Sequence, residues 1–329
     1  MGFNLDEVVN EYAEIYGQLK KELKWKVSDE RSLMLVASLY MMSKKSFDLE
    51  PFVDVSDYIK RNVGFFSTLK SSQRFTTAAM LDIRYDHPKE KFEDFIDVYE
   101  KCVNGGFRRG PFTYIAALCL LRDNSINKNV EALIQRGMEV YKAMKNEHFF
   151  LTGESDYPLA LLLAQVDQDI DEMMKNISYF YHELNGNGFR RGNDLQFLSH
   201  ILSLQKVEDP YLLIARATRL LDDFKQAGRR IKTIYYPVIG ILSLLENCSN
   251  EVPNVMNLFQ RLNSEKLFKW HKDMNFMIAV NLIVKDKVEH SSLLSASIQT
   301  TIEAVIQAQQ AAMIAAMAGT AVATSSSNT

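Results

Sequence analysis

The chain has 329 residues, of which 47% are hydrophobic and 24% are charged, and its formal net charge is −3. This weakly acidic balance argues against a general nucleic-acid binder, which needs a basic surface to displace counterions. The three cysteines stand apart and form no CxxC pair, so we expect buried, reduced thiols rather than disulfides or metal ligands.

The N-terminal segment carries Asp6, Glu7, Glu11 and Glu14, and therefore lacks the apolar stretch of a secretory signal. The longest apolar run, residues 33–42, is too short to cross a bilayer. We therefore expect a cytoplasmic protein.

A repeated sequence motif predicts the architecture of the chain. NGGFRRG at residues 104–110 returns as NGNGFRRG at 185–192, so that Phe107 and Phe189 lie 82 positions apart. Weaker copies of this slot fall at Phe268 and, going backwards, at Trp25. Internal repeats of this kind are typical of arrays of helical hairpins.

A second type of hairpin alternates with the first. Tyr157-Pro158 and Tyr236-Pro237 open similar apolar stretches, and a weaker relative begins near Phe75. Together the two types predict about seven helical hairpins that start near positions 25, 75, 107, 149, 189, 231 and 268. The expected fold is all-α, either an open α/α solenoid or a closed α/α toroid, because periodicity does not decide between the two.

Apolar spacing separates two layers of helices. The second helix of each pair has one apolar stripe, as in Met173, Ile177, Phe180, Tyr181 and Leu184. The first helices are apolar on most faces and should form the more buried layer, as at residues 115–121 and 159–164. Glycines after the second helices are expected to end them in the left-handed region, with the following Phe as the apolar contact of the cap.

The expected helical repeat domain covers residues 1–303, and residues 304–329 form an Ala/Ser-rich tail. Ala favours helix but partitions weakly into membranes, so the tail is predicted to be a helix with a disordered Ser-rich end. Two alternatives stay open: an exposed helix that packs on a partner or a second copy, and a membrane-inserted helix.

The loops that enter the first helices carry the candidate site residues. They are Arg108, Arg109, Glu154, Asp156, Tyr157, Arg190, Arg191 and Asp194. In a structural interpretation, Arg108 or Arg191 pairs with Glu154 or Asp156 and joins successive hairpins. In a functional interpretation, each Arg pair beside a helix N-terminus holds a phosphate or carboxylate.

No other stretch predicts a reaction. The chain contains no GxxxxGK[ST], GxSxG, HExxH or GxGxxG motif, and we expect neither a cofactor nor a metal. His200 lies inside an apolar run and is expected to be a hydrogen-bonded core histidine rather than a catalytic base.

The runs GESDYPLA at 153–160 and NGFRRGNDLQFLS at 187–199 resemble an uncharacterised bacterial family defined only as a domain of unknown function. Its members, found chiefly in Gram-positive spore formers, are similar over nearly the whole chain, including the Ala/Ser-rich end. The resemblance implies a bacterial cytoplasmic protein. It carries over no activity, cofactor or catalytic residue.

These features favour a non-enzymatic helical-repeat protein that binds a protein or peptide partner through its loop edge or concave face. The alternative is a toroid enzyme or small-molecule binder that holds an anionic ligand at the Arg-Arg loops, with Glu154 or Asp156 as general acid or base. Neither nucleic acid nor a membrane is an expected partner.

Overall fold

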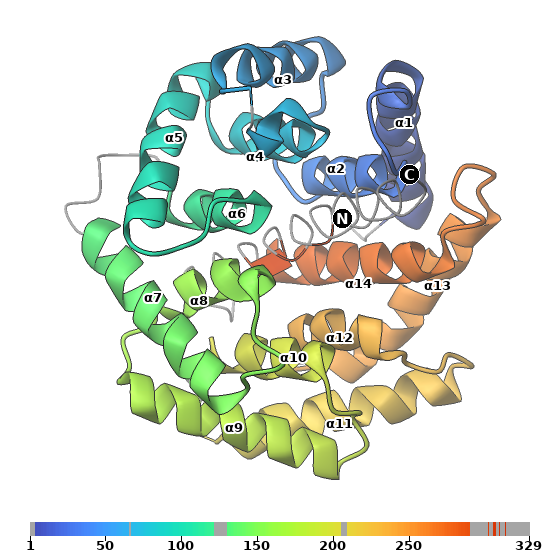
Figure 1. The fold of residues 1–329 in the computed structure, drawn as a ribbon. Coiled ribbons are helices and arrows are strands. Elements are labelled where there is room, and N and C mark those ends of the chain that lie inside the picture. Colours follow the sequence, from blue (N-terminus) through green and yellow to red (C-terminus); the bar gives the residue numbers. More distant parts are fainter. Residues whose placement is uncertain are drawn as a thin grey trace, which may run out of the picture. The chain divides into compact units, whose positions relative to one another are not determined.

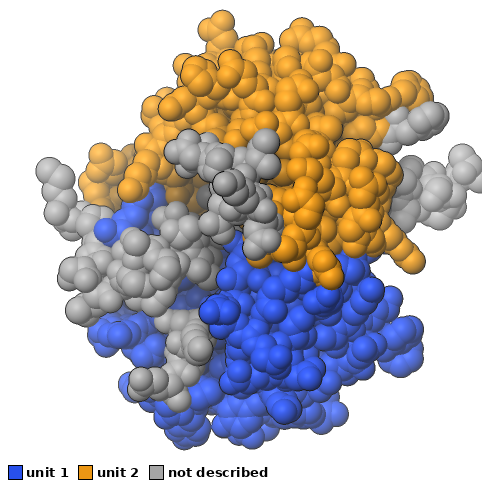
Figure 2. All heavy atoms as spheres, turned by 90° about the vertical axis from the view of Figure 1, so that its left-hand side faces the viewer, with its two compact units in different colours: residues 1–3, 136–306 blue, residues 4–135, 307–329 orange. Residues whose placement is uncertain are grey.

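The computed structural model describes residues 4–65, 67–121, 130–204 and 209–289, together with Ile302, Val305, Ile306, Gln309 and Met313. Every regular element in this described part is a helix, which confirms the all-α prediction. The chain divides into two compact units, which Figure 2 shows in different colours. Unit 1 comprises residues 1–3 and 136–306, and unit 2 comprises residues 4–135 and 307–329.

Unit 2 contains three consecutive helix pairs. Its helices are α1 (Leu5–Leu23), α2 (Arg31–Met41), α3 (Leu49–Asn62), α4 (Gln73–Arg84), α5 (Pro88–Asn104) and α6 (Pro111–Leu120). Each odd-numbered helix packs on the helix that follows it, and α4 also packs on α2 and α6. The even-numbered helices therefore form an inner layer, and the odd-numbered helices form an outer layer.

Unit 1 continues the same order. Its helices are α7 (Val130–Glu147), whose first turns belong to unit 2, and α8 (Tyr157–Leu163), α9 (Ile170–Gly186), α10 (Asn193–Ser203), α11 (Pro210–Gln226), α12 (Tyr236–Ser243), α13 (Val252–Ser264) and α14 (Lys272–Glu289). The inner helices α10, α12 and α14 pack side by side, and α11 contacts both α9 and α13. Figure 1 shows α9 and α11 on the outside of α10 and α12.

The burial pattern follows the predicted layers. Met173, Ile177, Phe180, Tyr181 and Leu184 of the outer helix α9 are all buried, which confirms the predicted stripe. Every residue of the inner helices α8 and α12 is buried. An outer helix covers the core with one face, whereas an inner helix is covered on most sides.

The repeated glycines end outer helices in the predicted left-handed conformation. Gly106, Gly188 and Gly228 have φ angles of 103°, 99° and 81°. The next residue then donates its backbone N–H to a carbonyl five positions back, over 3.1 Å from Phe107, 3.1 Å from Phe189 and 2.8 Å from Arg229. This is the Schellman motif, in which glycine avoids the strain that a side chain would meet at positive φ.

The repeated phenylalanine position is buried, as predicted. Phe107, Phe189 and Phe268 are at most 2% exposed. Trp25, which the spacing assigned to the same slot, is 88% exposed and does not occupy it. The helix α1 ends at Lys24 in the right-handed region, with φ of −53°, so no left-handed residue turns Trp25 inward.

Hydrogen bonds join four of the outer-to-inner connections to the next inner helix. In unit 2 the hydroxyls of Ser67 and Tyr114 lie 3.0 Å apart. In unit 1 the corresponding bonds join Gln196 to Thr152, Arg190 to Tyr236 and Lys232 to Asp273, at 2.8, 3.0 and 2.8 Å. Because paired helices are antiparallel, the outer-to-inner connections of each unit follow one another along a single edge.

Ile302, Val305, Ile306, Gln309 and Met313 are helical, and the first four of these are buried. Their positions i, i+3, i+4, i+7 and i+11 are those of one helix face. The rest of the predicted tail lies outside the described residues. Among the helices of the described ranges, none is both long enough and apolar enough to cross a lipid bilayer.

Candidate functional site

The Arg pair of unit 2 is engaged by its own helix. Arg109 donates two hydrogen bonds of 2.7 Å to the carboxylate of Glu100 on α5. This bidentate bond raises the pKa of Arg109 above its ordinary value. Arg108 is exposed, and its carbonyl accepts a hydrogen bond from the Thr113 hydroxyl.

Arg109 lines a cavity of about 450 Å³ in unit 2. The stacked rings of Tyr99 and Tyr114, whose centroids lie 3.8 Å apart, form part of its wall. The volume suits a small ligand. However, Glu100 already takes two of the guanidinium hydrogen bonds that an anion would need.

The Arg pair of unit 1 lies at the start of α10. Both Arg190 and Arg191 are exposed. The backbone N–H of Arg190 donates to Tyr236, and the Nε of Arg191 donates to the amide oxygen of Asn185 over 3.0 Å. Arg191 is thus bonded to the end of the preceding helix α9, and the expected ion pair between Arg191 and Glu154 or Asp156 is not formed. Asp194 lies half-buried in the first turn of α10, where a carboxylate interacts favourably with the helix dipole.

The acidic loop before α8 has a structural role. Asp156 is 6% exposed, and its carboxylate accepts a 2.9 Å hydrogen bond from the backbone N–H of Gly153. Tyr157 is buried and its ring packs edge-on against Tyr141, with centroids 4.8 Å apart. Asp156 and Tyr157 therefore hold the α7–α8 connection and do not present groups to a ligand.

Burial raises the pKa of Asp156 from 3.8 to about 6. Between about pH 4 and pH 6 the native state therefore holds a proton on Asp156 that the unfolded chain has lost. The free energy of unfolding falls over this range and has lost this contribution once the pH rises through 6. We expect Asp156→Asn, which cannot ionise, to gain up to about 3 kcal/mol over the wild type between pH 4 and pH 7. Urea unfolding of both proteins at several pH values measures this gain; a difference that does not change with pH would contradict it.

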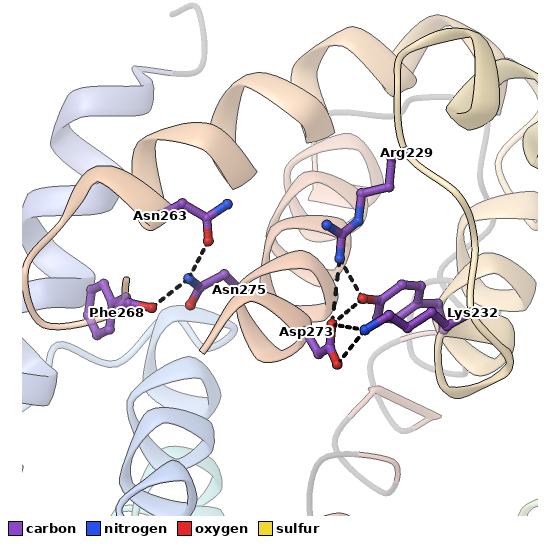
Figure 3. Close-up of polar contacts among 7 residues, drawn as sticks. Arg229, Lys232, Asn263, Phe268, Asp273 and Asn275 are labelled. Carbon is purple, nitrogen blue, oxygen red and sulfur yellow. Dashed lines mark hydrogen bonds and ion pairs between the residues drawn. The ribbon is translucent and has the colours of Figure 1, made fainter. Parts of the chain in front are cut away.

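Arg229 belongs to a loop that the sequence also marks by its Arg229-Arg230 pair, but its role as the third residue in the Schellman position was not predicted. Its guanidinium lies 4.2, 4.7 and 5.1 Å from the ring centroids of Phe259, Phe276 and Tyr235. Figure 3 shows it directed towards Asp273, which also binds Lys232. Arg229 therefore fills the slot that Phe107 and Phe189 fill elsewhere, and it is held among aromatic rings.

The exposed charges on the connections of the outer-to-inner edge of unit 1 all have one sign; the nearest exposed acids, Glu147 and Glu183, belong to the last turns of the outer helices α7 and α9. We define this edge as the connections at 148–156, 187–192, 227–235 and 265–271, together with the first turn of each helix that follows. Its exposed charged side chains are Arg190, Arg191, Arg230, Lys232, Lys266, Lys269 and Lys272. The acidic residues of the same segments are half-buried or buried: Glu154, Asp156, Asp194, Glu265 and Asp273. We call this surface the basic edge.

Six of these seven cations lack a carboxylate partner among the described residues; the exception is Lys232, which binds Asp273. The equivalent edge of unit 2 differs, because Lys26 binds Glu22 and Arg109 binds Glu100. Lys24 on the edge of unit 2 is also exposed and lacks a carboxylate partner among the described residues, so uncompensated cations are more numerous on the basic edge of unit 1 but are not confined to it.

Large apolar side chains stand among these cations. Phe149, Phe150, Ile234, Leu267 and Trp270 are 64%, 95%, 44%, 38% and 81% exposed. Lys269 lies 5.0 Å from the ring centroid of Trp270. Exposed apolar side chains that gather on one surface indicate an interaction site, whereas scattered ones need no explanation.

The opposite edge of unit 1 has the opposite charge. It comprises the described parts of the inner-to-outer connections, at 164–169, 204, 209 and 244–251, with the first turn of each following helix. Its exposed charged residues are Asp167, Asp169, Asp171, Glu172, Asp209 and Glu246. The two edges of unit 1 are thus segregated by charge, although the whole chain carries a formal net charge of only −3.

Burial keeps the thiol of Cys102 and the imidazole of His200 uncharged at neutral pH. Burial raises the pKa of the Cys102 thiol to about 12, so this thiol stays protonated and unreactive. His200 is fully buried, as predicted. No described group forms a hydrogen bond with either ring nitrogen, so the prediction of a hydrogen-bonded histidine is wrong. Burial, with His148 nearby, lowers its pKa to about 3. The described residues include no cluster of three or more metal-ligating side chains.

Comparison with known proteins identifies the family but not an activity. Residues 15–311 match the family described as "Protein of unknown function (DUF4003)". The chain is also 41% identical to the uncharacterized protein YeaA of Bacillus subtilis over 315 residues, which cover 95% of both chains. No solved structure matches the chain. The resemblance noted in the sequence is thereby confirmed, and the chain belongs to the DUF4003 family of proteins of unknown function.

Proposed function

We propose that this protein is a non-enzymatic, cytoplasmic helical-repeat protein that docks onto an anionic partner through the basic edge of unit 1. The consecutive helix pairs support a tandem array, whether solenoid or toroid, in which connections of one kind share an edge. The protein or peptide partner that the sequence led us to expect is such an anionic partner if its surface is acidic.

One observation carries the proposal: every exposed charge on the basic edge is positive, and six of the seven cations have no carboxylate partner among the described residues. A surface of one sign attracts partners of the opposite sign and speeds their association. The exposed Phe and Trp side chains supply apolar contact area on the same surface.

The alternative function, an anionic ligand held at the Arg-Arg loops, has less support. The guanidinium of Arg109 donates two hydrogen bonds to Glu100, and the Nε of Arg191 donates one to the amide oxygen of Asn185. Asp156, the candidate acid or base, is buried beneath its own loop. The proposal therefore places binding on the whole edge rather than in a single Arg-lined pocket.

Photocrosslinking tests the proposal even though the partner is unidentified. A photoreactive phenylalanine analogue replaces Phe150 or Trp270 on the basic edge, or Tyr211 on the opposite edge, in the full chain inside cells. Tyr211 is a matched control because it is also an exposed aromatic residue of unit 1, at 62%. We expect adducts, analysed by mass spectrometry for both protein and lipid, from positions 150 and 270 and not from position 211.

A further inference from the structure

We infer that the anionic partner of the basic edge is the surface of a lipid bilayer that contains acidic phospholipids. This inference rests on the proposed function and names its partner. It replaces the expectation from the sequence that no membrane is a partner, and it concerns contact with the bilayer surface, which requires no helix to cross it.

The kinds of side chain on the basic edge favour a lipid surface over a protein surface. Four of its seven exposed cations are lysines. Lysine is depleted in protein–protein interfaces, whereas lysines close to a membrane are attracted to acidic headgroups. Trp270 lies between Lys269 and Lys272 in the sequence and is 81% exposed. Tryptophan flanked by cations is typical of the membrane–water interface, where the ring enters the headgroup layer.

The arrangement of the apolar side chains points the same way. Phe150 and Trp270 are 95% and 81% exposed, and they lie in the first and the last of the four connections. Side chains that protrude fit a fluid partner, which deforms around them, without the shaped pocket that a rigid protein anchor needs.

The size of the edge is sufficient for this contact. Packed helices lie about 8–10 Å apart, so four connections in a row span about 25–30 Å. Six uncompensated cations along such a row can each approach a headgroup. The opposite edge carries Asp167, Asp169 and Asp209 among its exposed acids and would be repelled by the same membrane. The charge segregation therefore also sets the orientation of unit 1 on the bilayer.

Vesicle flotation of the full chain tests this inference. The probes are vesicles made from equal parts of phosphatidylglycerol and phosphatidylcholine, and vesicles of phosphatidylcholine alone. We expect binding to the first kind only, and weaker binding at high salt. Arg190→Ala with Arg191→Ala should weaken binding about 20- to 30-fold. Phe150→Ala with Trp270→Ala should weaken it about tenfold or more.

The matched control is Tyr211→Ala with Leu212→Ala, which removes two exposed apolar side chains from the opposite edge of unit 1. It should bind the acidic vesicles like the wild type. An equal loss in this control, equal binding to neutral vesicles, or no binding to acidic vesicles would overturn the inference. If vesicles do not bind while positions 150 and 270 crosslink to a protein or nucleic acid, the inference fails but the docking edge stands.

Fluorescence gives a readout that does not depend on edge variants folding normally. Trp25 and Trp270 are the two tryptophans of the chain, so Trp25→Phe leaves Trp270 as the reporter. We expect its emission to shift to shorter wavelength with the acidic vesicles and to stay unchanged with neutral ones. Unchanged emission with both would contradict contact between Trp270 and the bilayer.

Discussion

Replacing Phe189 with alanine should lower the free energy of unfolding by about 3–5 kcal/mol, as expected for a large side chain removed from a core. Phe189 is 1% exposed and its ring centroid lies 4.8 Å from that of Tyr236 at the start of α12. It follows the left-handed Gly188 and closes the cap of α9 through its bond to Leu184. The alanine variant therefore loses both the core contact and the link to the next helix pair.

Urea unfolding at neutral pH measures this loss, and Phe189→Leu is its control. Leucine keeps most of the apolar volume, so it should cost about 1.5 kcal/mol or less. A Phe189→Ala protein within about 1 kcal/mol of the wild type would show that this phenylalanine does not hold the hairpin connection.

Arg229→Ala should lower the free energy of unfolding by about 2–4 kcal/mol, because it removes contacts with three rings and a charged partner. The Arg229 side chain is 15% exposed, and no described group bonds to its buried Nε–H. Phenylalanine stands at the equivalent position after α5 and α9. Arg229→Phe should therefore cost less than half as much, because it keeps the ring contacts and removes the unbonded donor.

Thermal and urea unfolding of the two Arg229 variants distinguish these terms. Asp273 keeps Lys232 and the Tyr235 hydroxyl as partners in both variants, so its carboxylate is not left alone. If alanine and phenylalanine cost the same, the ring contacts of Arg229 do not stabilise the fold, and the ion pair with Asp273 accounts for its effect.

Local patterns in the sequence predicted much of the fold. The glycines at 106 and 188, the phenylalanines that follow them, and the stripe of α9 all depend on neighbours within one or two helix turns, which periodicity records. The role of Arg229 could not be predicted in this way, because a cation fills an apolar slot there. Its place among Phe259, Phe276 and Tyr235 depends on residues up to 47 positions away.

The candidate site was predicted only in part. The sequence singled out Arg190 and Arg191, and the structure places both on an exposed edge. Nothing in the sequence indicated that the exposed charges of this edge all have one sign, because that sign depends on which acidic residues become buried. Asp156 turns back to Gly153, and Asp273 is bound by Lys232 from another connection. Exposure is decided by such tertiary contacts, and composition alone does not report it.

The docking role of the basic edge is tested most directly by comparing crosslinking yields in cells at Phe150 and Tyr211. Both side chains are exposed and aromatic, and both belong to unit 1, but their edges carry opposite charge. The account predicts partner adducts at position 150, reduced by Arg190→Ala with Arg191→Ala, and background at position 211. Equal yields at the two positions, or adducts at 211 alone, would contradict it.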